Sequence, residues 1–194
     1  MTSSVKTSKL ISIGIDVGTV NGAISIVDED GNILLLTKAP YYQTEIKSKR
    51  NKSKLNKETG KYEADFRKRN WVDFTQLRKL FEPYLKCPKI YTIERIMNRA
   101  SEGATAGFVN GNALGIFQGL YALLEPCVYY EPTPGEWKKA MGLGSVKDSS
   151  VTLAEEIYKI KLKDYLPKGK VDDIAEALLL SFYGFKKYYE NERK

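Results

Sequence analysis

Two acidic side chains stand at the ends of runs that otherwise have the pattern of buried strands. Asp16 closes the run ISIGID just before a glycine-containing turn, and Glu94 closes the shorter run KIYTIE. Strands rarely contain Asp, and a buried carboxylate without a partner costs free energy. Metal binding or general-base chemistry would explain such acids. Asp16 alone could instead cap the turn that follows it. Glu94 alone could form a salt bridge with Arg95 or Arg99.

A further acidic group opens the last apolar segment of the chain. The stretch VDDIAEALLLSFYGFKKYY, residues 171–189, has apolar residues at helical spacing. Asp173 and Glu176 are three residues apart and therefore share one helix face. Asp172 is an additional acid, and the spacing to Glu176 favours Asp173 over it. Asp172 and Asp173 alone could instead form an N-terminal helix cap, where acids also interact favourably with the helix dipole.

The composition limits the chemistry that these acids could perform. The chain of 194 residues has no histidine, which excludes Ser-His and Cys-His nucleophiles and imidazole zinc sites. Carboxylate oxygens favour Mg²⁺, with Mn²⁺ able to substitute, and two ions about 4 Å apart could act on one phosphate. The two cysteines, Cys87 and Cys127, are far apart, so we expect reduced thiols and no disulfide framework.

A basic segment interrupts the pattern of strands. Residues 47–70 contain ten Lys or Arg against three acids, which accounts for the whole net charge of +7. The pattern predicts an extended loop or hairpin arm, inserted at about 41–70, that contacts nucleic-acid phosphates. A solvated surface loop is the alternative. The residues expected to contact DNA in this arm are Lys47, Lys49, Arg50, Lys52, Lys54, Arg67, Lys68 and Arg69.

The elements that would position these groups follow a recognisable order. Apolar periodicity and turn residues predict three strands, then a helix, a strand, a long helix, a strand and at least two further helices. This βββ-α-β-α-β-α-α order predicts an α/β, RNase H-like fold, with a mixed five-stranded sheet of three antiparallel and then two parallel strands flanked by helices. We expect residues 1–194 to form one such domain. Helices are expected at 71–84 and 101–124, the latter packing closely through Gly107, Gly111 and Gly115.

Four blocks of the sequence carry a family resemblance: GIDVGTVNGAISIVD, YTIERIM, PTPGEWKKAMGLGS and VDDIAEALLLSFYG. Together they resemble the RuvC family of Holliday-junction resolvases, which are RNase H-like endonucleases. The resemblance spans about residues 11–184, and the basic insertion makes the chain more similar to phage or viral members. It implies a homodimer that binds four-way DNA junctions and nicks one strand per subunit, at symmetric positions, with Mg²⁺.

The resemblance also implies roles for individual residues. The family's four catalytic, metal-binding acids fall on Asp16, Glu94, Asp173 and Glu176, although the last is often Asp in the family. Cellular members have a stacking aromatic residue where this chain has Met97, and a catalytic lysine where it has Asp148. Lys147, one residue earlier, is the expected catalytic lysine. The further residues expected to contact DNA are Met97, Asn98, Arg99 and Lys138.

Other functions are compatible with parts of this sequence. The same fold could serve a broader flap, fork or RNA nuclease, or a relative that binds nucleic acid without cutting it. The motif GIDVGT also opens sugar kinases and actin-like ATPases, but those need a second domain and a second glycine motif that this sequence lacks. No apolar run approaches the roughly 20 residues of a membrane span, and residues 1–9 do not resemble a secretory signal. We therefore expect a cytoplasmic protein, in the host cytoplasm if the chain is viral.

Overall fold

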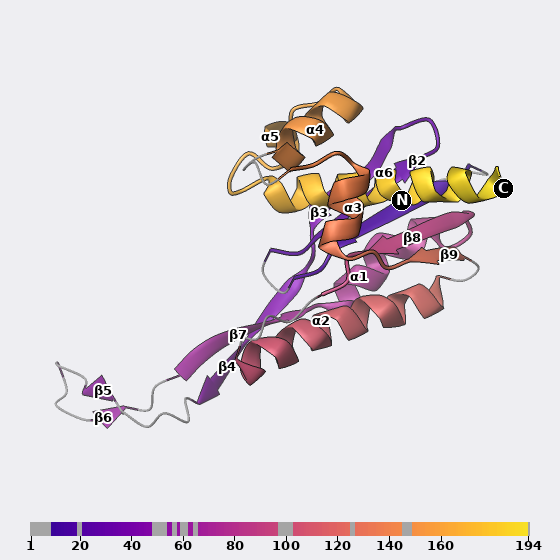
Figure 1. The fold of residues 1–194 in the computed structure, drawn as a ribbon. Coiled ribbons are helices and arrows are strands. Elements are labelled where there is room, and N and C mark those ends of the chain that lie inside the picture. The colour runs from indigo at the N-terminus through magenta and orange to yellow at the C-terminus, as the bar shows by residue number, and fades with distance from the viewer. Residues whose placement is uncertain are drawn as a thin grey trace.

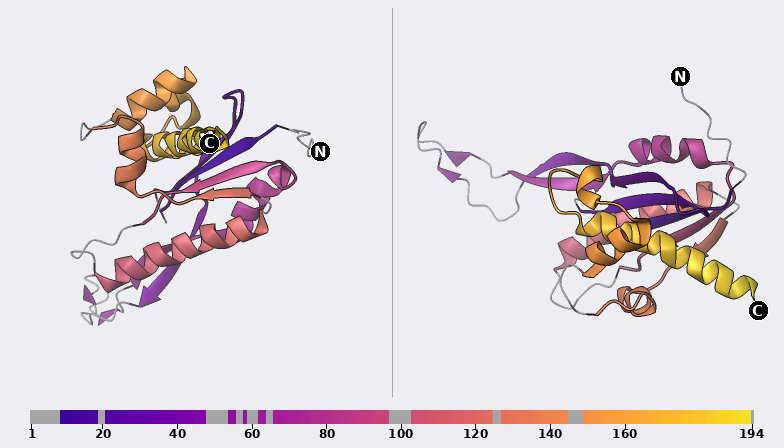
Figure 2. Two further views of the ribbon diagram at one scale, coloured as in Figure 1. Left: turned by 45° about the vertical axis from the view of Figure 1, so that its right-hand side comes forward. Right: turned by 90° about the horizontal axis from the view of Figure 1, so that it is seen from above.

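The computed structural model describes residues 9–18, 21–47, 54–55, 58, 62–63, 66–96, 103–124, 127–144 and 149–193. Figures 1 and 2 show a sheet between helices, with a narrow arm projecting from one end. No helix of the described residues is both long and apolar enough to cross a membrane. The elements are β1 (Ile11–Asp16), β2 (Ala23–Asp28), β3 (Ile33–Lys38), β4 (Tyr41–Lys47), β5 (Lys54–Leu55), β6 (Tyr62–Glu63), β7 (Phe66–Val72), α1 (Phe74–Phe81), the short 3-10 helix η1 (Glu82–Tyr84), β8 (Lys89–Ile93), α2 (Ala104–Leu123), β9 (Cys127–Tyr130), α3 (Pro134–Ala140), α4 (Ser149–Tyr158), α5 (Leu162–Tyr165) and α6 (Asp172–Glu192).

The central sheet has the strand order β3-β2-β1-β8-β9. The first three strands are antiparallel neighbours, β8 lies parallel to β1, and β9 lies parallel to β8. Both parallel pairings need a crossover, and helices supply them, as is usual for parallel strands. The predicted α/β fold with three antiparallel and two parallel strands is therefore confirmed.

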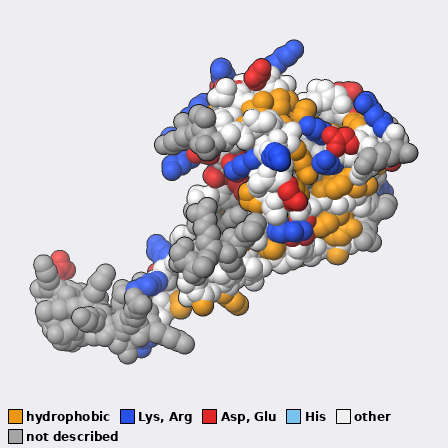
Figure 3. All heavy atoms as spheres, viewed as in Figure 1, with side chains coloured by type: hydrophobic (Ala, Val, Ile, Leu, Met, Phe, Trp, Pro, Cys, Tyr) orange, Lys and Arg blue, Asp and Glu red, His pale blue; other side chains and the backbone are white. Residues whose placement is uncertain are grey.

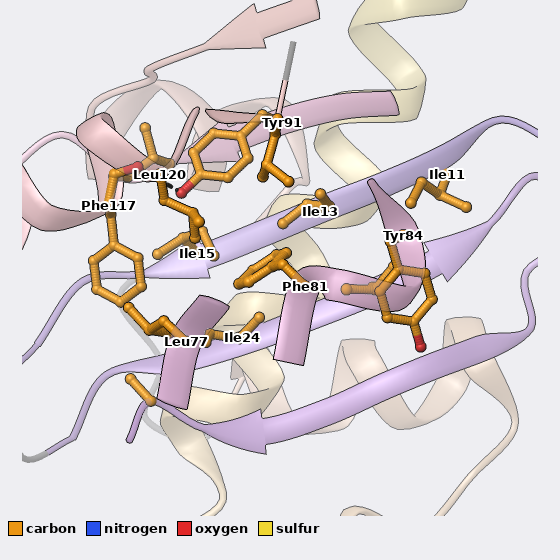
Figure 4. Close-up of a cluster of buried hydrophobic side chains, with 14 of the residues drawn as sticks. Ile11, Ile13, Ile15, Ile24, Leu77, Phe81, Tyr84, Tyr91, Phe117 and Leu120 are labelled. Atoms are coloured by element: carbon orange, nitrogen blue, oxygen red, sulfur yellow. Dashed lines mark hydrogen bonds between the residues drawn. The ribbon is translucent and has the colours of Figure 1, made fainter. Parts of the chain in front are cut away.

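Successive side chains of β1 point to opposite faces of the sheet, so they pack against two different layers of helices. Ile11, Ile13 and Ile15 point into one hydrophobic core, where they meet α1 and α2. Figure 4 shows these isoleucines beside Phe81 from α1 and Phe117 from α2. The other face of β1 carries only small or polar residues, and α6 packs against it. Because successive side chains alternate, the acid that ends this strand lies on the α6 face.

Small side chains bring α6 unusually close to β1. A Cβ atom added to Gly14 would lie 2.1 Å from the carbonyl oxygen of Ala177, so only glycine fits there. Buried hydroxyls fill the remaining contact: Ser12 Oγ donates to the Ser181 carbonyl at 2.8 Å, and Ser25 Oγ donates to the Ala177 carbonyl at 2.7 Å. Buried polar groups of this kind are stabilising only when paired, and these are paired. These contacts fix the distance of α6 from the sheet and its position along β1.

A second hydrophobic cluster holds α6 from its other side. Trp137 of α3, Ala154 of α4 and Leu162 of α5 are buried together with Ile174 and Leu178 of α6. Burial of such side chains contributes roughly 1.5–3 kcal/mol for each large residue. The first turns of α6 are therefore clamped between the sheet and three short helices.

The helix expected at 71–84 is shorter than predicted. It begins at Phe74, with Asp73 as its N-cap, whose carboxylate accepts from the Gln76 backbone N–H at 3.0 Å. Trp71 and Val72 belong instead to β7, where they pair with two tyrosines of β4. Their apolar side chains matched the helical spacing by chance, because their actual partners lie on another strand.

The expectation that α2 packs closely through its glycines is wrong for Gly111 and Gly115. Nothing lies within 4 Å of a Cβ added to either residue. The core instead receives Ala113, Phe117 and Leu120 from the same helix. The glycine spacing therefore marks the outward face of α2. Gly107 was included in the same prediction, and no contact distance tests it.

The arm is a two-stranded antiparallel ribbon that continues directly from β3. Only Ala39 and Pro40 separate β3 from β4, and β4 pairs with β7 along its whole length. A short β5–β6 pair lies farther out along the arm. Figure 1 shows the ribbon leaving the body at the end of the sheet where β1 terminates.

Candidate active site

Asp16 lies at the end of β1 on the α6 face. Its neighbours in the same row of the sheet are Ala23 on β2 and then Lys38 on β3. No hydrogen bond or ion pair reaches the Asp16 carboxylate from the residues that the structure describes. The turn-capping alternative therefore has no contact to support it in this part of the chain.

The surroundings of Asp16 make its ionised form costly. Burial raises the pKa of this carboxyl well above its ordinary value, and the charges of Glu94, Glu176 and Asp173 raise it further. The nearby Lys38 ammonium opposes this rise only in part. A desolvated acid facing three other acids is the arrangement that a bound cation would stabilise.

Glu94 follows β8 and lies beside Asp16. Its backbone N–H donates to the Ile15 carbonyl at 3.0 Å, which continues the parallel pairing of β8 with β1. Its carboxylate accepts a hydrogen bond from Trp137 Nε1 at 2.8 Å. Burial raises the pKa of Glu94, and the Trp137 hydrogen bond opposes that rise. Arg95 does not pair with Glu94, because its guanidinium lies 3.7 Å from Glu131 instead.

Asp173 and Glu176 enter the site from the first turns of α6. Asp173 forms an ion pair with Lys38, and Glu176 accepts from Lys138 Nζ at 2.8 Å. Ser150 Oγ also donates to Glu176, at 3.3 Å. Neither Asp172 nor Asp173 caps the helix, since Val171 occupies the N-cap position without a side-chain hydrogen bond. Both acids do lie in the first turn of α6, where the helix dipole favours them, so only the capping part of that alternative lacks support.

The donor set suits a hard divalent cation. Four carboxylates approach this end of the sheet, the described residues bring no sulfur ligand there, and the chain has no histidine, which is the chemistry of Mg²⁺ or Mn²⁺ sites. As the side chains stand, no three potential ligands among the described residues surround one ion position. Two of the four carboxylates are bound to lysine ammonium groups instead. These residue types therefore suit a divalent cation, although Asp173 and Glu176 are paired with lysine side chains.

Several of the predicted site residues cannot be placed. Lys138 is brought to the acids, through Glu176. Asp172 is the first residue of α6 and is partly exposed. Outside the described residues lie Lys147, Met97, Asn98, Arg99, Lys49, Arg50 and Lys52, and Lys54 is described only as part of β5. The remaining predicted DNA contacts, Lys47, Arg67, Lys68 and Arg69, lie on the ribbon.

Two residues of the site were not predicted in the roles they have. The sequence assigns no role to Lys38, and Trp137 stands out only as part of the block PTPGEWKKAMGLGS. Trp137 is fully buried and is placed by α3, whose start is fixed by reciprocal hydrogen bonds between Thr133 and Glu136. The PTPGEW stretch signals such a helix start, but the 43-residue separation of Trp137 from Glu94 gives no sign of their contact.

The ribbon has two different faces. Trp71 lies on one of them, where it contacts Phe108 of α2 with ring centroids 6.1 Å apart. Arg69 also lies on this face, with its guanidinium 5.8 Å from the Trp71 ring centre. The other face carries the cross-strand pairs Gln43–Asn70 and Glu45–Lys68, and Gln43 donates to Asn70 at 2.8 Å. Figure 3 shows Lys and Arg side chains along the described part of the arm.

Sequence comparisons find no match for the chain, whether with protein-family models or with curated proteins. Solved structures do match it. RuvC of Thermus thermophilus in complex with a Holliday junction substrate has a TM-score of 0.56 and 14% identity, over 94% of this chain and 96% of that one. A second Thermus thermophilus RuvC structure has a TM-score of 0.52 and 13% identity, over 93% and 96% of the two chains.

The yeast mitochondrial Holliday junction resolvase matches with a TM-score of 0.50 and 16% identity, over 93% of this chain and 82% of that chain. At such low identity, these likenesses show a shared fold. The chain thus has the RuvC-type, RNase H-like fold that its sequence blocks predicted, and the matches extend over nearly its whole length.

Proposed function

We propose, from the fold shared with RuvC and the acids gathered at one end of its sheet, that this chain is an endonuclease that cleaves four-way DNA junctions. The observation that carries the proposal is the meeting of Asp16, Glu94, Asp173 and Glu176 from three separate elements. Asp16 is partly buried and has no partner among the described residues, and desolvation together with the charges of the other three acids raises its pKa. Such an arrangement costs stability and is expected where it serves chemistry.

The carboxylates would hold Mg²⁺ or Mn²⁺, two ions per site. Bound there, such ions activate a water molecule and stabilise the leaving oxygen of a phosphodiester. The chain's own residues position these acids. Trp137 holds the Glu94 carboxylate through its indole N–H, and the close contact at Gly14 fixes the distance between α6 and β1. Lys138, beside Glu176, supplies positive charge where the cleaved phosphate would develop negative charge.

The ribbon is the proposed contact to a duplex arm of the junction. Its first strand begins at Tyr41, three residues after Lys38, so it starts at the candidate site. Its exposed Lys47, Arg67 and Lys68 can pair with phosphates. A two-stranded ribbon also fits the major groove of DNA. The arm therefore supports nucleic acid as the substrate class.

The exposed face of α2 supports the proposed homodimer. Phe108 is 63% exposed and Leu123 is 59% exposed, and the outward glycines leave a low surface between them. Small residues allow a close approach of a second helix. Two subunits related by a twofold axis would place two such sites on one four-way junction, as symmetric nicking requires.

A cleavage assay tests the proposal. Labelled four-way junction, fork and linear duplex are incubated with Mg²⁺, with Mn²⁺ and with EDTA. Paired, metal-dependent nicks in the junction alone are the expected result, and they should be lost in Asp16→Asn and Asp173→Asn. Asp172→Asn is the matched control, which should keep most of the activity. Equal cutting of forks would support the broader branched-DNA nuclease, and junction binding without cutting under any metal would contradict the nuclease.

A further inference from the structure

Lys38 is an unexpected member of the acidic site. It is the last residue of β3 and lies in the same sheet row as Asp16, separated from it only by Ala23. Its side chain is 26% exposed and pairs with Asp173, whose own side chain is 24% exposed. The ammonium also lies 3.4 Å from the Asn21 carbonyl oxygen. The contact therefore joins the end of β3 to the first turn of α6.

The charges of the site are unevenly compensated. Each of the acids Asp173 and Glu176 has a lysine partner, whereas Asp16 and Glu94 have none among the described residues. The two acids without a lysine are also those whose pKa is raised. A divalent cation that bound between Asp16 and α6 would meet two different carboxylates. That of Asp16 has no partner among the described residues, whereas the charge of Asp173 is already compensated by Lys38.

An ammonium group and a divalent cation compete for the same carboxylate oxygens. They also repel each other, so both cannot stay close to Asp173 without cost. Lysine can yield in this competition because its charge is carried on a flexible four-carbon stem. Once it leaves Asp173, the ammonium remains at the edge from which the ribbon starts.

We infer that Lys38 is a positioning residue of the metal site: its ammonium is the internal counter-cation that holds Asp173 in the metal-free protein, and a divalent cation must displace it. This inference rests on the proposed function, because it assumes that Asp173 takes part in binding metal. It assigns Lys38 a role that opposes metal binding and supports the fold when metal is absent. Lys138 forms the parallel contact on Glu176.

The affinity of the whole protein for Mn²⁺, without DNA, measures this role directly. Free Mn²⁺ can be followed by electron paramagnetic resonance during titration of wild type, Lys38→Met and Lys9→Met. Lys38→Met should bind Mn²⁺ about tenfold more tightly, the fold-change that corresponds to about 1.4 kcal/mol. Lys9→Met is the matched control, because Lys9 forms an exposed pair with Asp30 away from the site, and its Mn²⁺ affinity should equal that of wild type.

A second readout and a second variant complete the test. In EDTA, Lys38→Met should unfold at a lower urea concentration than wild type, and saturating Mn²⁺ should reverse the order. Lys38→Arg keeps the charge and can hold Asp173 with two hydrogen bonds, so it should bind Mn²⁺ more weakly than wild type. It carries the test if Lys38→Met does not fold.

The outcomes separate this inference from the proposed function. If wild type binds Mn²⁺ and Lys38→Met binds it no more tightly, the inference is wrong while the proposed nuclease stands. Equal or tighter binding by Lys38→Arg would also overturn it. If wild type binds no Mn²⁺ at all, the metal site fails, and the proposed function and this inference fail with it.

Discussion

Replacing Gly14 by alanine tests whether the contact between β1 and α6 sets the geometry of the acids. The added Cβ would lie 2.1 Å from the Ala177 carbonyl oxygen and 2.6 Å from the Ser181 backbone nitrogen. Ordinary Cβ contacts lie at 3.4–4 Å and essentially none are shorter than 3.0 Å, so the helix must move away by about 1 Å. Both neighbours are backbone atoms, which cannot yield by changing a rotamer.

The size of the effect follows from this displacement. Overpacking of a core costs about 1–3 kcal/mol, and stretching the two buried serine hydrogen bonds adds about 1 kcal/mol. We expect the free energy of unfolding to fall by about 2–4 kcal/mol. Asp173 and Glu176 belong to α6, so the same shift moves them out of alignment with Asp16. A displacement of about 1 Å can lower the rate of cleavage about 100-fold.

Urea unfolding followed by circular dichroism measures the first effect, and single-turnover cleavage of a four-way junction measures the second. Gly135→Ala on α3 is the matched control, since nothing lies within 4 Å of its added Cβ and it lies outside the proposed dimer face of α2. That variant should be as stable as wild type or more stable, by up to about 1 kcal/mol from helix propensity. If Gly14→Ala stays within about 0.5 kcal/mol of wild type, the close packing described above is refuted.

Three further predictions concern charge. In EDTA, Asp16→Asn should be more stable than wild type by about 1–3 kcal/mol at neutral pH, because it removes a partly buried acid that faces three other acids and has no described partner. Since the folded-state pKa of Asp16 is raised, wild type loses stability as pH rises through that pKa, so urea midpoints of the two proteins should converge in acid. Trp137→Phe removes the hydrogen bond that opposes the raised pKa of Glu94, so the acidic limb of the pH–rate profile should move to higher pH. Lys68→Ala should reduce the slope of log affinity against log salt by about 0.9 for junction DNA, whereas Lys79→Ala on α1 should leave it unchanged; equal slopes for wild type and Lys68→Ala would remove this lysine from the DNA contact.

The fold could be predicted because its signals are local. The isoleucines of β1 alternate with small residues, and Asp16 at the strand end takes the next position on the face of the small residues. The same alternation in β8 places Glu94 on the face that carries Asp16. Given the order of the elements, the two acids had to meet, since β1 and β8 are parallel neighbours.

The contacts of Lys38 and Trp137 could not be predicted in the same way. Lys38 ends β3 in a position where a lysine usually faces solvent, and its partner Asp173 lies 135 residues later. The start of α1 was misplaced because Trp71 and Val72 fit a helical spacing while pairing across the ribbon. The glycines of α2 were misread because a small residue is equally compatible with a tight contact and with an open surface.

The length of the ribbon sets a distance scale for the whole molecule. Each of its strands has seven residues, and an antiparallel strand advances about 3.4 Å per residue, so the paired part reaches about 20 Å beyond the end of the sheet. Duplex DNA rises about 3.4 Å for each base pair. A ribbon lying along a duplex would therefore lengthen the stretch of DNA that the protein covers by about six base pairs beyond the end of the sheet. Adding one residue to both strands would lengthen the footprint by about one base pair, whereas adding it to only one strand would turn every side chain beyond that point to the opposite face.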